Sequence, residues 1–96
     1  MITHTALFRL KHLKGSAGEA AFLKAADCLV AIPGVENFQK LRQVSPKNDF
    51  MFCFSMEFNS QKEYDFYNTH PDHMAFVQGK WIPEVEKFME VDYEKL

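Results

Sequence analysis

Hydrophobic and polar positions alternate with a period of two in two separate segments of the chain. In residues 2–10, one face carries Ile2, His4, Ala6, Phe8 and Leu10. In residues 50–58, one face carries Phe50, Phe52, Phe54, Met56 and Phe58 without a break. This period predicts two β-strands, each with one face in a hydrophobic core. His4 is expected on the core side, because it shares its face with the apolar set.

Two Ser-x-x-Glu sequences predict the starts of helices. Ser16 with Glu19, and Ser60 with Glu63, match the capping box, in which each residue satisfies a free backbone N–H of the other. After the first box, apolar residues recur at spacings of three and four, at Phe22, Ala25, Ala26, Leu29 and Val30. This helix is expected to stop in residues 32–34, Ile-Pro-Gly, because proline cannot continue the hydrogen-bond ladder.

The second helical region is expected to be broken at His70-Pro71. A residue before proline is disfavoured in the helical conformation, so the helix that carries Tyr64 and Tyr67 should end near His70. Pro71 suits the first position of a new helix, which should run to about Ile82.

Two further strands are expected over residues 37–44 and 86–93, with a turn over residues 45–48. The order is then β-α-β-β-α-α-β, close to the ferredoxin-like βαββαβ arrangement with its second helix broken. The predicted fold class is α+β, with helices on one face of a four-stranded antiparallel sheet. Because 96 residues without a Gly/Ser/Pro-rich linker suffice for one core, residues 1–96 are expected to form a single domain.

The sheet face away from the helices is expected to be apolar as well. It would carry Thr5, Leu7, Met51 and Cys53, which is too apolar a surface for so small a protein to leave in water. A second copy that packs sheet to sheet would cover it, so a homodimer is predicted.

Composition argues against several classes of partner. A net charge of −2 and a pI near 6.0 leave no basic footprint for nucleic acid. No stretch approaches the roughly 20 apolar residues of a membrane span, and the first residues lack a signal-peptide pattern, so a cytoplasmic protein is expected.

The two cysteines, Cys28 and Cys53, lie in apolar periodic segments without metal-ligand spacing. They are expected to be buried free thiols.

Candidate chemistry is concentrated in residues 67–75. Tyr67, His70 and His73 lie close together there, and a helical projection places His73 on the same side as Phe76, Val77, Met74 and Trp81. His73 should therefore face the sheet surface that carries His4.

Structural roles for the same residues stay open. His4 and His73 could be hydrogen-bonded core histidines, Tyr67 a core aromatic residue, and His70 a support for the turn. A zinc site is disfavoured, because Pro71 separates the two rings and no further ligand completes a tetrahedral set.

The order of these motifs resembles the stress-responsive dimeric α/β-barrel (Dabb) domain family. The features that carry the resemblance are His4 before Leu7-Phe8, the Ile-Pro-Gly-Val at residues 32–35, the strand at 50–58, the Tyr67-x-x-His70-Pro71-x-His73 element and the Val-Asp-Tyr at residues 91–93. The resemblance spans nearly the whole chain. It implies a ferredoxin-like protomer whose sheet pairs with that of a second copy to form a barrel with the helices outside.

Most members of this family have no assigned activity, and a stress-associated role is implied only by the family's description. One member, a plant polyketide cyclase that makes olivetolic acid, implies His73 as a general base and Tyr67 as its partner hydroxyl, with His4 and His70 nearby. A cofactor-free ring closure needs such a base, together with a donor for the developing oxyanion. Ala25 replaces an aromatic residue of that enzyme's tail pocket, so a long polyketide substrate is not implied.

Two functions follow from the residues and the resemblance. In one, the protein is a dimeric module whose cleft holds a small hydrophobic molecule; in the other, it is a cofactor-free cyclase or lyase that acts on a carbonyl compound. Phe54, Phe76 and Trp81 would line the cleft in either case, or would fill an ordinary core. Plant relatives also imply a cation site made of main-chain carbonyls, which would fall here at Leu29, Ile32 and Val35.

Overall fold

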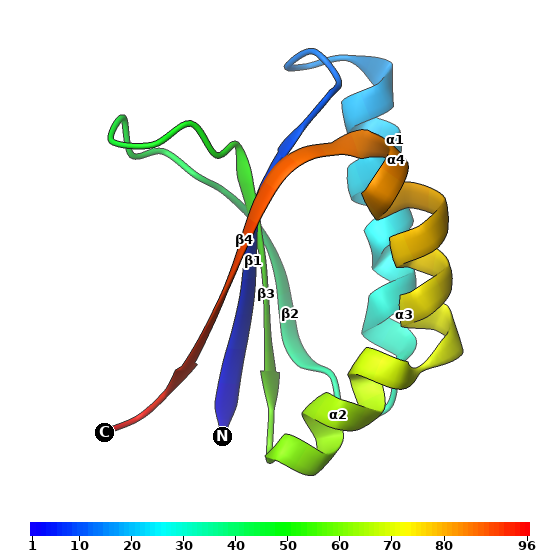
Figure 1. The fold of residues 1–96 in the computed structure, drawn as a ribbon, viewed down its shortest axis with the longest axis vertical. Helices are drawn as coiled ribbons and strands as arrows, with labels where there is room; N and C mark the ends of the chain where they lie inside the picture. Colours follow the sequence, from blue (N-terminus) through cyan, green and yellow to red (C-terminus); the bar gives the residue numbers. More distant parts are fainter.

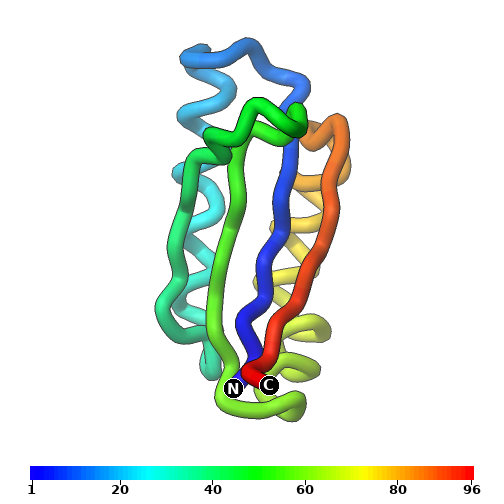
Figure 2. Tube along the Cα trace, turned by 90° about the vertical axis from the view of Figure 1, so that its left-hand side faces the viewer, coloured from blue at the N-terminus to red at the C-terminus, as the bar shows by residue number.

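A computed structural model of residues 1–96 has a four-stranded sheet with all of its helices on one face (Figure 1). The strands are β1 (Ile2–Leu10), β2 (Glu36–Arg42), β3 (Phe52–Phe58) and β4 (Val85–Glu94). The α-helices are α1 (Ala17–Ala25), α2 (Gln61–Thr69), α3 (Pro71–Phe76) and α4 (Ile82–Glu84), with a 3₁₀-helix η1 (Ala26–Ala31) after α1 and a π-helix η2 (Val77–Trp81) after α3. Figure 2 shows the four strands side by side with the helices behind them.

The strand order is β2-β3-β1-β4, and each pair of neighbours is antiparallel. This confirms the predicted α+β, ferredoxin-like arrangement. In the pairing of β1 with β4, His4 lies opposite Asp92, Ala6 opposite Glu90, and Phe8 opposite Phe88. The register therefore places Asp92, Glu90 and Phe88 on the helix-facing side of the sheet, although they are far from β1 in sequence.

The core lies between this face of the sheet and the helices. Phe8, Phe22 and Phe58 are fully buried in a cluster of thirteen residues from β1, β3 and the helices. The period-two pattern of β1 and β3 is reproduced, since every second side chain is buried from His4 to Leu10 and from Phe52 to Phe58, while Ile2 at the start of β1 is only partly buried. His4 is buried with them, as predicted.

The first helical segment differs from the prediction after Ala25. There the α-helix changes to a 3₁₀-helix, in which residues three apart share a face, so Ala26, Leu29 and Ile32 are buried together. Val30 and Cys28 are exposed instead. The prediction that Cys28 is a buried thiol is therefore wrong, and Cys53 is only partly buried, although both cysteines are free as expected.

Both helices begin where the Ser-x-x-Glu sequences predict, but neither capping box is complete. The Glu19 N–H donates to the Ser16 hydroxyl at 3.2 Å, whereas the Ser16 N–H donates to the Leu13 carbonyl at 3.1 Å and leaves the Glu19 carboxylate unused. At the second helix, the Ser60 hydroxyl donates to the Glu63 carboxylate. A helix thus begins at each predicted position, with one of the two capping-box bonds at α1 and with no side-chain bond to a backbone N–H from Ser60 at α2.

The break at His70-Pro71 is present, and the following helix runs further than predicted. His70 is extended, with φ −65° and ψ 136°, and Pro71 opens α3. Past Trp81 the chain continues through α4 to Glu84 instead of ending at about Ile82. Proline is tolerated there because it lies in the first turn of α4, where a backbone N–H has no obligatory partner.

Strand ends differ from the predicted ones by one or two residues. β2 ends at Arg42 instead of Val44, and β3 begins at Phe52 instead of Phe50. The Phe50 N–H donates to the Asn48 side chain at 3.0 Å, so the turn extends into the expected strand.

The outer face of the sheet carries apolar residues that no helix covers. Thr5, Leu7 and Cys53 are partly exposed at its centre, and Met89 and Tyr93 are about half exposed on β4. An apolar sheet face of this kind is typical of an interface with another chain. None of the helices has the length and apolar character needed to cross a membrane.

Candidate functional site

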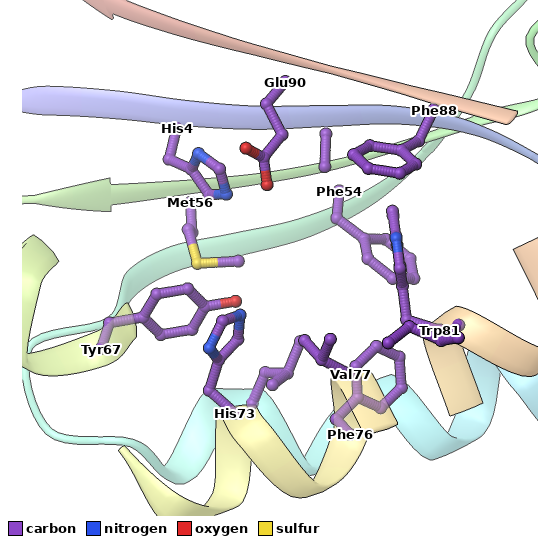
Figure 3. A pocket seen from close by; sticks show the side chains of 13 residues that line it. His4, Phe54, Met56, Tyr67, His73, Phe76, Val77, Trp81, Phe88 and Glu90 are labelled. Carbon is purple, nitrogen blue, oxygen red and sulfur yellow. The ribbon is translucent and has the colours of Figure 1, made fainter. Parts of the chain in front are cut away.

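A cleft of about 350 Å³ opens between the inner face of the sheet and the helices that run from α2 to α4 (Figure 3). Ten of its thirteen lining residues are hydrophobic, so most of its wall is apolar. The lining residues are His4, Ala6, Leu29, Phe54, Met56, Tyr67, His73, Phe76, Val77, Trp81, Ile82, Phe88 and Glu90. The cleft brings together His4, Phe54, Tyr67, His73, Phe76 and Trp81, which the sequence analysis had singled out.

Asp92 and Tyr64, which the sequence did not assign to the site, position the ring of His4 by hydrogen bonds. Its Nδ1 lies 2.6 Å from Asp92 Oδ1, and the Tyr64 hydroxyl donates to Asp92 Oδ2 at 2.8 Å. Because a carboxylate only accepts, Nδ1 of His4 carries a proton and donates it to Asp92. The pKa of Tyr64 is raised, first by burial and then by its bond to Asp92, so its hydroxyl stays protonated.

Tyr67 and His73 form the second polar part of the cleft. Their ring centroids are 4.2 Å apart, and both side chains point into the cleft from the α2–α3 corner (Figure 3). Tyr67 is buried, and burial, followed by the nearby Glu90 charge, raises the pKa of its hydroxyl. The hydroxyl is therefore a hydrogen-bond donor over the whole physiological range.

The side chain of His73 is a neutral imidazole at pH 7. Its Nδ1 lies 3.2 Å from the main-chain carbonyl of Asn68, which can only accept, so Nδ1 carries the proton and Nε2 the lone pair. Burial lowers the pKa of His73 below its ordinary value. A neutral imidazole with a free Nε2 can accept a proton from a ligand in the cleft.

Glu90 is the remaining polar residue of the cleft, and the sequence analysis missed it. Its carboxylate points inward from β4 between His4 and Phe88 (Figure 3). Alternation along residues 85–94 puts Phe88, Glu90 and Asp92 on one face, a signal that was available in the sequence. Only the strand register shows that this face is the one turned toward the helices.

The aromatic wall comes from β3, α3, η2 and β4. Trp81 contacts Phe88 with ring centroids 5.6 Å apart in an edge-to-face arrangement, and Phe54 and Phe76 lie 6.3 and 6.5 Å from Trp81. The wide turn of the π-helix η2 leads directly to Trp81. π-Helical turns are rare and are often found at functional sites.

Two predicted groups lie outside the cleft. His70 caps α3, because its Nδ1 accepts the Asp72 N–H at 3.1 Å, and it does not line the cavity. The main-chain carbonyls of Leu29 and Ile32 each accept a hydrogen bond within the turn, from the Ile32 and Val35 N–H groups. A cation site at Leu29, Ile32 and Val35 stays a prediction. No cluster of three acidic, histidine or cysteine side chains has the geometry to hold a metal ion.

The fold and the cleft together define a small ferredoxin-like α+β protein with a ligand-sized cavity between its sheet and its helices. The chain belongs to the family described as the stress-responsive A/B barrel domain, whose sequence profile matches residues 2–95. The resemblance found in the sequence is thereby confirmed. No protein with a curated description matches the chain.

Solved structures agree with this assignment. A Dabb family protein with a ferredoxin-like fold from Mesorhizobium loti is 55% identical, with a TM-score of 0.97 over 99% of this chain and 96% of the other. A dimeric ferredoxin-like protein of unknown function from Thermobifida fusca is 22% identical, with a TM-score of 0.80 over 98% and 90%. A hydroxynitrile lyase from Passiflora edulis is 17% identical, with a TM-score of 0.83 over 96% and 90%, and shares the fold.

Proposed function

We propose that this protein is a homodimer in which each protomer binds a small, largely apolar molecule in the cleft beside His4, Tyr67 and His73. The observation that carries the proposal is the cleft itself, an apolar cavity of about 350 Å³ with a few convergent polar groups. Cavities of this size and composition are typical of small-molecule sites.

The apolar outer face of the sheet supports the dimer. It lies opposite the cleft, so a second copy packed against it would leave the cavity accessible. Structures from Thermobifida fusca and Bacteroides fragilis with this fold are described as dimeric. Pairing of the two sheets would remove Leu7, Met89 and Tyr93 from water.

A native mass spectrum of the purified protein tests both parts of the proposal. We expect a dimer mass, with added mass on a fraction of the protomers that is lost on denaturation. The retained compound can then be identified in the released fraction. A dimer to which no small apolar compound binds, whether as purified or on titration, would contradict the ligand site.

The substitution Leu7→Asp is expected to convert the dimer to a monomer. It would place two carboxylates in the centre of the apolar interface, where neither has a partner. Val30→Asp, at an exposed position on the helical side, is the matched control and should leave the dimer intact. Light scattering coupled to gel filtration measures both masses. A dimeric Leu7→Asp protein would show that the sheets do not pair through this face.

A second function, proton transfer to and from a carbonyl compound, is favoured by the state of His73. A neutral imidazole whose Nε2 is free, 4.2 Å in centroid distance from the ring of a protonated tyrosine, supplies a base and a donor together. Nε2 would take a proton from the carbon next to the carbonyl, and the electron pair left behind would move onto the carbonyl oxygen. The Tyr67 hydroxyl would stabilise that oxyanion by a hydrogen bond. The fold shared with a plant lyase is compatible with this chemistry, although a fold alone does not determine a reaction.

If His73 is the base, the rate of proton transfer should stay constant as the pH is lowered to neutrality, and it should fall only at acidic pH. The base must be unprotonated, and burial lowers the pKa of His73, so activity should persist to pH values below the unperturbed histidine pKa of about 6.5. The measurement is the exchange of the α-protons of 4-phenyl-2-butanone with deuterated solvent, followed by NMR as a function of pH. If the rate already begins to fall above neutral pH as the pH is lowered, the base is a different group.

A further inference from the structure

We propose that the cleft selects ligands that carry an amine, whose ammonium group binds to the Glu90 carboxylate and to the aromatic rings beside it. This inference rests on the proposed ligand site and adds the chemical class of the ligand. It comes from three features of the cleft: its charge, the free carboxylate of Glu90 and the arrangement of its aromatic residues.

The cleft contains a carboxylate and no lysine or arginine. The polar lining residues other than Tyr67 are Glu90 and two histidines. Of the histidines, His73 is kept neutral because burial lowers its pKa, and His4 is already paired with Asp92. A ligand carboxylate would therefore meet Glu90 and find no cationic partner. An ammonium group would meet a charge of opposite sign.

The basic side chains around the cleft are turned outward and engaged. Lys87 on β4 pairs with Asp49 at 2.7 Å, Lys80 on η2 pairs with Glu84 at 3.2 Å, and Arg9 on β1 pairs with Glu86 at 3.0 Å. None of these groups reaches the cavity. No basic side chain of the protein therefore neutralises the negative charge of the carboxylate in the cleft.

Glu90 differs from its acidic neighbours because it has no partner within the chain. On the same strand, Glu86 pairs with Arg9, and Asp92 is bonded to both His4 and Tyr64. No hydrogen bond or ion pair engages the Glu90 carboxylate, which is exposed at the mouth of the cleft and points into it (Figure 3). A free carboxylate directed into an otherwise apolar cavity is suited to a positively charged donor.

Aromatic rings surround the space next to this carboxylate. Phe88 lies two residues before Glu90 on the same face of β4, and its ring meets Trp81 at an interplanar angle of 74°. Cations bind over aromatic faces at roughly 6 Å or less from the ring centroid, and most strongly over tryptophan. The rings of Phe54 and Phe76 lie beside Trp81 and would hold the apolar part of the ligand.

Fluorescence of Trp81 reports directly on this site, because it is the sole tryptophan of the chain and it lines the cleft. The whole protein is titrated with three probes of similar size: 2-phenylethylamine, 2-phenylethanol and 3-phenylpropionate, which are cationic, neutral and anionic at pH 7. We expect the amine to bind most tightly and the acid most weakly. In Glu90→Gln, the affinity for the amine should fall about tenfold, while that for the alcohol stays within about twofold.

Glu94→Gln is the matched control. It changes the net charge by the same amount on the same strand but lies outside the cleft, so it should leave the order and strength of binding unchanged. If the alcohol binds but the amine has no advantage, or if the advantage survives in Glu90→Gln, the amine inference is overturned and the ligand site stands. If none of the three probes binds, isothermal titration included, the proposed ligand site fails, and the amine inference fails with it.

Discussion

Replacement of His73 by alanine is expected to abolish the exchange of α-protons in a bound ketone while leaving the fold intact. General-base catalysis by a positioned side chain contributes about 10²- to 10⁴-fold, so the rate with 4-phenyl-2-butanone should fall by that factor. The fold should tolerate the change, because His73 is only partly buried and its ring packs mainly against Tyr67. We expect a loss of about 1 kcal/mol or less in the free energy of unfolding.

The matched control is His70→Ala, which removes an imidazole three residues away that caps α3 and does not line the cleft. It should lower stability by about 1 kcal/mol and leave the exchange rate nearly unchanged. Tyr67→Phe should retain the ring and reduce the rate, because the oxyanion donor is lost. If the His73→Ala protein exchanges protons as fast as the parent, or if it unfolds, His73 is not the base and its role is to pack the core.

Replacement of Phe8 by alanine is expected to cost about 3–5 kcal/mol of folding free energy. Phe8 is fully buried in the second half of β1, and its ring contacts Phe22, Phe52, Phe54 and Trp81 at centroid distances between 4.6 and 5.7 Å. Its removal would leave a cavity between the sheet and the helices. Because domains of this size are stable by roughly 5–15 kcal/mol, such a loss is a large part of the total.

Urea denaturation at a fixed protein concentration measures this loss, since the stability of a dimer depends on concentration. Phe66→Ala is the control, because Phe66 is half exposed on α2, and its replacement should cost about 1 kcal/mol or less. The cavity left by Phe8 should also enlarge the cleft, because Phe54 and Trp81 line the cleft and pack against Phe8. A Phe8→Ala protein as stable as the control would show that the core collapses into the gap.

The three-residue period of η1 explains the one part of the core that the sequence pattern misassigned. The pattern of residues 22–30 fits an α-helix, and under that interpretation Val30 lies on the buried face and Cys28 is enclosed. Packing against α3 and the tight turn before Pro33 favours a 3₁₀-helix, which turns both side chains to the surface. Most of the stability of a helix in a protein comes from tertiary packing, so tertiary contacts decide the helix type here.

The sequence by itself determined the four strands to within two residues of their ends, the break before Pro71 and the side of β1 and β3 that faces the core. These features depend on local chemistry: the two-residue period of β1 and β3, and the constraint that proline places on His70. The inward direction of His73 and its approach to His4 also followed from periodicity, because each residue lies on the apolar side of its own element.

Only the tertiary structure decided which distant residues complete the site. Asp92 reaches His4 because β4 pairs with β1 in one particular register, and Tyr64 joins them because α2 docks over that end of the sheet. The same register turns Glu90 into the cleft, and a shift of one residue would turn it to the opposite face of the sheet. Alternation along a single strand does not specify its register with a neighbour, because register is determined by the packing of all the strands and helices together.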